Sequence, residues 1–326
     1  IRIYIMFKKT LIAAAVATVA STAAMADVTI GGKVKQTFTS TDSATAATDQ
    51  WAGGTDAFLT FKGSEDLGNG MSAFADIRMD LDGAAGALAT FDTKVGIKGG
   101  FGTVVAGRME DFSESKVLSM VDVFSGQGVE LGGSNATRND DAVAYVSPSF
   151  NGLTVGVAGY AMADGNGSNN GSDSFDATDI ALMYANGPLT VNVAVETIDQ
   201  AIADAASVNM AEKTTSFGVG YTMGNLKMAA VYQDIENEAI AGTLTPANDH
   251  NDLMLAAVYT MGNNSIAVGW NENELTTGAT DNNTTSVELR HNFSARTQAF
   301  VGATQDDFAT AANETDTVYM GLSHSF

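Results

Sequence analysis

The sequence contains no cysteine and only 3 prolines in 326 residues. A chain without cysteine forms neither a disulfide framework nor a thiolate metal site, and it is safe in an oxidising compartment. Charged residues make up only 17% of the chain, and 16 lysines and arginines stand against 38 aspartates and glutamates, a formal net charge of −22. Because so few cations cannot build a basic face for phosphates, nucleic acid is excluded as a partner.

Long hydrophobic runs are also lacking, except near the start of the sequence. There, two lysines precede an apolar stretch at 11–20, and the small residues at 24–26 resemble a signal-peptidase site. The stretch is shorter than the roughly 20 residues that a membrane-spanning helix needs. We therefore interpret residues 1–26 as an N-terminal extension and signal peptide, cleaved before Asp27, and residues 27–326 as one exported domain.

Glycine is abundant, with 34 residues, and apolar and polar residues alternate along many segments. Leu189, Val191 and Val193, for example, alternate with the polar Thr190 and Asn192. Such alternation gives a β-strand one apolar and one polar face. Soluble β-sandwiches show the same pattern, so it indicates strands without deciding how they are arranged.

The spacing of the connections separates these two architectures. Seven short turns rich in glycine and asparagine recur, at 67–70, 99–102, 149–152, 186–188, 223–225, 261–264 and 293–296. Long polar segments alternate with them, for example 163–176, 200–213 and 237–251. Short turns at one end and long loops at the other are typical of outer-membrane barrels, and a Greek-key sandwich does not keep this order. Seven such turns, joining eight hairpins, predict sixteen strands.

A membrane-spanning sheet must also close on itself. In lipid every backbone amide and carbonyl has to be paired within the protein, so an open sheet edge is not allowed. A ring of sixteen strands is too wide for side chains to fill. The sequence thus predicts an all-β fold, a 16-stranded antiparallel transmembrane β-barrel with a water-filled lumen, located in the bacterial outer membrane.

Four segments, in order along the chain, resemble the general trimeric porins of Gram-negative bacteria. They are the hairpin turn at 61–70, the strand at 101–108, the strand and turn at 138–152, and the last strand, which ends on Phe326. The resemblance covers essentially all of residues 27–326. It implies a homotrimer that conducts small hydrophilic solutes and ions by passive diffusion, embedded among outer-membrane lipid and lipopolysaccharide. It also implies that the barrel-assembly machinery reads the terminal phenylalanine.

An internal loop is expected between the second and third short turns. The interval from Gly102 to Gly152 is longer than the other intervals, beyond ordinary loop variation. Residues 109–137, an amphipathic segment followed by glycines, resemble the porin loop that folds into the lumen and narrows it. A long surface loop is the alternative.

Charged side chains at such a constriction select solutes by the field between facing groups. On the loop, the candidates are Glu110, Asp111, Glu114, Asp122 and Glu130. Because the mature chain has a surplus of acidic residues, and loops such as 164–179 and 236–252 are acidic, we predict a mild preference for cations. We predict no cofactor, although Ca²⁺ or Mg²⁺ fits acidic loops that face lipopolysaccharide phosphates.

On the barrel wall, alternation places Lys33, Lys35 and Arg78 on the polar faces of their strands. The resemblance adds Arg108 and Arg138 as basic wall residues, each beside a matching motif. The sequence departs from the family at 56–60, where many members carry a further arginine and this chain has none. A complete ladder of basic residues is therefore not expected.

Three other functions compete with a general channel. An enzyme would need a catalytic constellation, but the three histidines are His250 in a predicted loop and His291 and His324 at lipid-facing positions, without an evident nucleophile. An adhesin or structural barrel would bind a host surface or phage through its long loops, a role that is compatible with channel activity unless the barrel is plugged. A solute-specific channel would carry a track of aromatic residues in the lumen, whereas most aromatics lie near predicted strand ends.

Overall fold

The protein is described from a computed structural model that covers residues 27–43, 51–81, 89–126, 138–161, 175–198, 213–236, 249–275, 282–308 and 314–326. The predicted signal peptide at 1–26 and the loop residue Glu130 lie outside these ranges. So do most residues of the long polar segments at 163–176, 200–213 and 237–251 and of the acidic loops at 164–179 and 236–252. The predictions made for them stay predictions.

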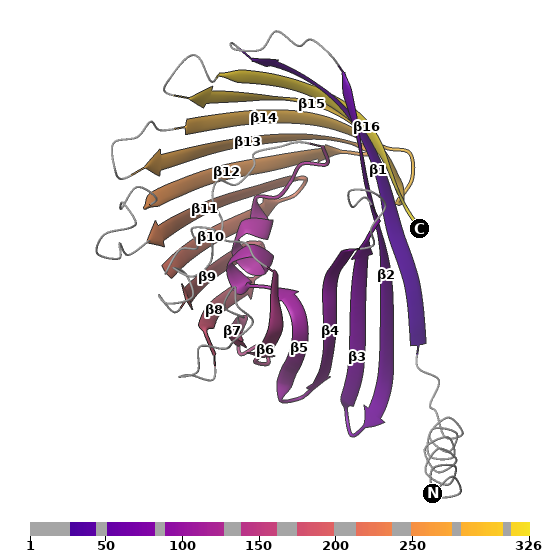
Figure 1. Cartoon of the computed structure of the whole chain (residues 1–326), viewed down its shortest axis with the longest axis vertical. Coiled ribbons are helices and arrows are strands. Elements are labelled where there is room, and N and C mark those ends of the chain that lie inside the picture. Colours follow the sequence, from indigo (N-terminus) through magenta and orange to yellow (C-terminus); the bar gives the residue numbers. More distant parts are fainter. Residues whose placement is uncertain are drawn as a thin grey trace, which may run out of the picture.

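The chain forms a closed barrel in which every strand is antiparallel to its neighbours in sequence and β16 closes onto β1 (Figure 1). The prediction of sixteen strands is confirmed. The strands are β1 (Asp27–Ser43), β2 (Ala52–Gly68), β3 (Met71–Asp80), β4 (Ala89–Gly99), β5 (Gly102–Glu110), β6 (Arg138–Val146), β7 (Leu153–Tyr160), β8 (Ala177–Asn186), β9 (Leu189–Ile198), β10 (Lys213–Met223), β11 (Leu226–Glu236), β12 (His250–Met261), β13 (Asn264–Leu275), β14 (Asn282–Asn292), β15 (Thr297–Phe308) and β16 (Thr315–Ser325).

The alternation along the strands separates the two faces of the wall as predicted. On β10, the side chains of Phe217 and Tyr221 are 44% and 45% exposed and lie on the outer face. On β9, Asn192 and Glu196 are buried on the inner face. An outer face of large apolar residues suits the hydrocarbon layer of a membrane.

The first and last strands are joined at the end of the chain. The backbone N–H of Gly32 donates to the carbonyl of Phe326, and the N–H of Phe326 donates to the carbonyl of Gly32, both at 3.1 Å. The two groups thereby extend the β1–β16 ladder to the last residue. This pairing leaves no unpaired edge at the seam, as lipid requires.

The segment after β5 folds into the barrel, which confirms the predicted internal loop. It contains a π-helical turn, η2 (Ser113–Val117), and a 3-10 turn, η3 (Leu118–Met120), which contact β9, β10 and β11. Figure 1 shows this segment in magenta beside those strands.

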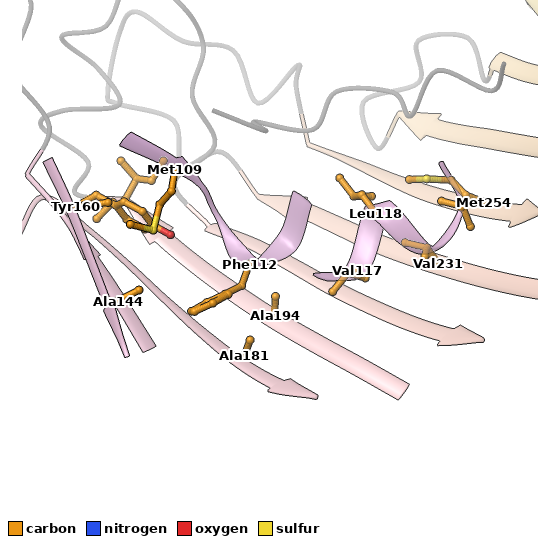
Figure 2. Packing of buried hydrophobic residues seen from close by; sticks show 14 of the residues in the cluster. Met109, Phe112, Val117, Leu118, Ala144, Tyr160, Ala181, Ala194, Val231 and Met254 are labelled. Carbon is orange, nitrogen blue, oxygen red and sulfur yellow. The ribbon is translucent and has the colours of Figure 1, made fainter. Parts of the chain in front are cut away.

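Buried apolar side chains lie between the internal loop and the inner wall. Phe112, Val117 and Leu118 pack against alanines of β8 and β9 and against Val231 and Met254 (Figure 2). Complete burial of a side chain such as Leu118 stabilises the loop by roughly 1.5–3 kcal/mol. The core of this protein is thus a thin layer that holds the loop against one side of the barrel.

In the part of the chain that the structure describes, no helix is long and apolar enough to cross a membrane.

Candidate functional site: the constriction

The root of the internal loop is held by polar groups of the wall. The carboxylate of Asp179 on β8 accepts the backbone N–H of Phe112, and the carboxylate of Asp111 accepts the N–H of Glu114 at 2.6 Å. These contacts satisfy two amides at the start of the helical turns, which have no partner within the helix.

The middle of the loop is bonded to the wall by side chains of β9, β10 and β11. Ser113 shares a hydrogen bond of 2.5 Å with Ser216, and the Gln233 amide donates to both hydroxyls. The Asn192 amide donates to the carbonyl of Lys116 at 2.6 Å. Because these groups are buried, loss of a partner costs more than an exposed hydrogen bond would contribute.

The tip of the loop is latched to β14. The carboxylate of Glu288 accepts the backbone N–H groups of Ser125 and Gly126 at distances of 2.9–3.0 Å. Arg290, two residues further along the same face, donates to Glu288 at 2.5 Å and to the carbonyl of Val123. The loop therefore spans the interior from β5 to β14.

Opposite charges face each other beside the loop. The groups whose charge acts most on Asp122 are Lys35, Lys33 and Arg290. Lys33 in turn lies within electrostatic range of Arg78. The structure thus brings together the loop acid Asp122 and the basic wall residues that alternation assigned to the lumen.

A second group of charges lies where the loop leaves the wall. Arg138 forms ion pairs with Glu110 and, at 3.5 Å, with Asp92. Glu114 is close enough to interact with Arg138, Glu110 and Asp122. Of the predicted site residues, Glu114 and Arg138 therefore lie within electrostatic range of each other.

The wall cations are largely paired with wall carboxylates. Lys35 lies 3.0 Å from Asp56, and Arg78 lies 3.5 Å from Asp80. Pairing reduces the field that these cations exert on a passing ion.

The structure does not bring Arg108 together with these groups. Its partner across the sheet is Thr93, which belongs to the exposed face of β4 with Val95. The guanidinium donates to Asp140 at 2.8 Å and to the carbonyl of Phe91. Alternation along β5 gives the same result, because Arg108 has the parity of Val104, which is exposed on the outer face.

Four residues of the site were not found by sequence reasoning. Glu288 and Arg290 hold the loop tip, and their alternation with Val287 and Leu289 was the available signal. Phe58 and Phe91 stack on the wall arginines. Phe58 has the parity of the polar Asp56 and Thr60, whereas Phe91 has that of the exposed Val95 and gave no signal. The strand 56–60, which lacks the arginine found in many porins, places Phe58 beside Arg78 instead.

Burial raises the pKa of three loop carboxyls. The pKa of Glu114 rises to about 7, and the negative charges of Asp111 and Glu110 add to the effect. The pKa of Asp111 is also raised, since its burial outweighs the N–H group of Glu114 that stabilises the anion. For Asp122, burial raises the pKa against the opposing charges of Lys35 and Lys33.

The acidic residues and histidines bear on metal binding and catalysis. Within the described ranges, no three His, Asp or Glu side chains are placed to hold a metal ion. His250 is the first residue of β12 and not a loop residue as expected. His291 bonds to Asn264 and His324 bonds to Thr297, both at exposed positions.

A closed barrel with an apolar outer face, narrowed by a charged loop fastened across its interior, defines a channel-forming protein of the outer membrane. The sequence profile described as Gram-negative porin matches residues 13–311. The chain therefore belongs to the Gram-negative porin family, and it is an outer-membrane porin.

Relatives with known names agree with this assignment. The chain is 26% identical to the major outer membrane protein P.IB of Neisseria lactamica over 343 residues, covering 88% of this chain and 100% of that protein. The P.IB protein of Neisseria gonorrhoeae is 32% identical over 195 residues, which cover 55% of this chain and 54% of that protein.

Solved structures share the fold at lower identity. The anion-selective porin from Comamonas acidovorans superimposes with a TM-score of 0.75 at 19% identity, covering 92% of this chain and 100% of that one. The trimer form of OmpT from Vibrio cholerae gives a TM-score of 0.70 at 14% identity, covering 92% and 99%. The barrel and its architecture are common to all three proteins.

Proposed function

We propose that this porin is a homotrimeric channel for passive diffusion of small hydrophilic solutes and ions, with a mild preference for cations. One observation carries the ion preference. The wall cations Lys35 and Arg78 are paired with wall carboxylates, whereas Glu114 and Asp122 extend the negative charge of the loop into the same region. A fixed negative surplus in a narrow aqueous space concentrates cations.

The experiment is a recording from the refolded mature protein in a planar bilayer under a KCl gradient. A cation-preferring channel gives ohmic conductance steps, and its reversal potential is displaced from zero toward the equilibrium potential of K⁺. The opposite sign refutes cation preference and would agree with the selectivity stated for the Comamonas acidovorans porin.

The number of conductance steps in which the channel closes tests the proposed trimeric state. The trimer form of Vibrio cholerae OmpT supports the proposal of three equal pores. A trimer is expected to close in three equal steps at high voltage. Closure in one step would contradict the trimer.

The same recording separates the alternatives. Adhesion through the long loops is compatible with conductance, whereas a plugged barrel that works only as an adhesin or structural protein gives none. A solute-specific channel conducts ions but is blocked by its own solute. Lipopolysaccharide, the barrel-assembly machinery, and Ca²⁺ or Mg²⁺ at the acidic loops remain proposed partners of the outer-membrane protein.

A further inference from the structure

Two phenylalanines and two arginines on the lumen wall form one stack. The guanidinium carbon of Arg78 lies 4.2 Å from the ring centre of Phe58 and 3.7 Å from that of Phe91. The guanidinium carbon of Arg138 lies 3.1 Å from the same Phe91 ring centre. Two guanidiniums at these distances would collide if both lay on the same face of the Phe91 ring. The ring therefore lies between the two arginines.

Phe91 reaches this position because of a β-bulge. Across β3 and β4, Arg78 pairs with Asp92 and the next residue, Met79, pairs with Thr90, so Phe91 is left without a partner. By alternation with Thr93 and the exposed Val95, Phe91 would face outward. The extra residue of a bulge is free to point its side chain elsewhere, and here the ring lies among the lumen arginines.

The stack restrains two cations that would otherwise move. Both arginines are partly exposed, at 29% and 19% of their side chains, and carboxylates lie beside both. A ring face attracts a guanidinium and also limits its movement toward Asp80 and Asp92, which lie 3.5 Å from Arg78 and Arg138 respectively. Phe91 does so for both arginines, whereas Phe58 contacts Arg78 alone.

We propose that Phe91 is a positioning residue for ion selectivity, which keeps Arg78 and Arg138 at fixed places on the lumen wall. It acts through the arginines and has no charge of its own. When the ring is removed, Arg78 approaches Asp80 and Arg138 approaches Asp92, each now 3.5 Å away, and the positive field of the wall falls.

The test compares Phe91→Leu with Phe91→Trp, using reversal potentials in a KCl gradient. Phe91→Leu is expected to raise the ratio of cation to anion permeability by about twofold, because a partly exposed cation–π contact is worth little more than thermal energy. Phe91→Trp keeps a ring between the arginines and should restore the ratio of the natural protein. Phe217→Leu, on the outer face of β10, is the matched control and should leave the ratio unchanged.

Two further variants distinguish positioning from a simple change in pore width. In a channel with Arg78→Gln and Arg138→Gln, the addition of Phe91→Leu should no longer change the ratio. If Phe91→Leu fails to assemble, Phe58→Leu tests the same idea, with a smaller shift in the same direction because only Arg78 loses a ring.

Several results overturn the inference. They are an unchanged ratio in conducting Phe91→Leu or Phe58→Leu channels, an equal shift with Phe91→Trp, and a shift that persists without the two arginines. The inference rests on the proposed channel activity but not on its ion preference, since it concerns a difference between variants. Absence of conductance in the natural protein would refute the channel, whereas an unchanged ratio in conducting variants refutes only the role of Phe91.

Discussion

Single glycines on the inner wall allow the side chains of the internal loop to pack closely against the strands. A Cβ atom on Gly156 of β7 would lie 2.7 Å from the ring of Phe112, and one on Gly218 of β10 would lie 2.8 Å from the sulfur of Met120. The sulfur is at the end of a flexible side chain, but the Phe112 ring is buried in the layer beneath the loop. The packing at Gly156 is therefore the less tolerant of the two.

Gly156→Ala is expected to lower the free energy of unfolding by about 1–3 kcal/mol, the usual cost of overpacking a core. The matched control is Gly63→Ala, because a Cβ atom on Gly63 would meet nothing within 4 Å. That change should stay within about 0.5 kcal/mol. Urea denaturation of the refolded barrels measures both free energies of unfolding. Equal effects of the two substitutions would contradict tight packing of Phe112 against Gly156.

The internal loop is the element that turns a barrel into a selective channel. Apolar contacts fix its first part against β8 to β11, and the Glu288 carboxylate fixes its tip on β14. The tip depends on a few polar contacts, whereas the first part is buried. We expect the two parts to differ in how easily they open.

Glu288→Gln should loosen the tip and leave the barrel intact. The amides of Ser125 and Gly126 lose charged acceptors, and hydrogen bonds to charged groups contribute about 1.5–3 kcal/mol. Hydrogen exchange in peptides that cover these amides should become faster by about tenfold, which corresponds to about 1.4 kcal/mol.

The control for this change is Glu236→Gln, which removes an exposed ion pair with Lys213. Exchange near the loop tip should not change in that variant. Unaltered hydrogen exchange at Ser125 and Gly126 in Glu288→Gln would show that the Glu288 carboxylate contributes little to the stability of the loop tip.

At the scale of the whole molecule, the fixed charge of the lumen depends on pH. Glu114 carries a pKa raised to about 7 by burial, so much of its charge is absent below neutral pH. Because the folded loop retains protons on Glu114 and Asp111 that an unfolded chain releases near pH 4, folding stability falls as pH rises from about 4 to 7.

The ratio of cation to anion permeability should therefore increase between pH 5.5 and 8.5, with a midpoint near the pKa of Glu114, about 7. Glu114→Gln should flatten that increase, whereas Glu65→Gln, at an exposed position of β2, should not. Reversal potentials measured at several pH values provide the test. A ratio that is constant over this range in the natural protein would exclude Glu114 as a selectivity group.

The sequence by itself determined the barrel, its sixteen strands and the presence of an internal loop. Alternation and turns are local patterns, and lipid permits only a closed ring for a chain that carries them. Lys33, Lys35 and Arg78 could be assigned to the lumen by the same alternation.

Only the tertiary structure decided which charged side chains of the loop and of the barrel wall lie close to one another. The electrostatic interaction of Asp122 with the lysines of β1, and the hydrogen bonds of Glu288 to the loop tip, join residues far apart in the chain. Phe91 is the extra residue of a bulge, which changes the face that alternation predicts. Because such a shift depends on how two strands pair, no local pattern in the sequence marks it.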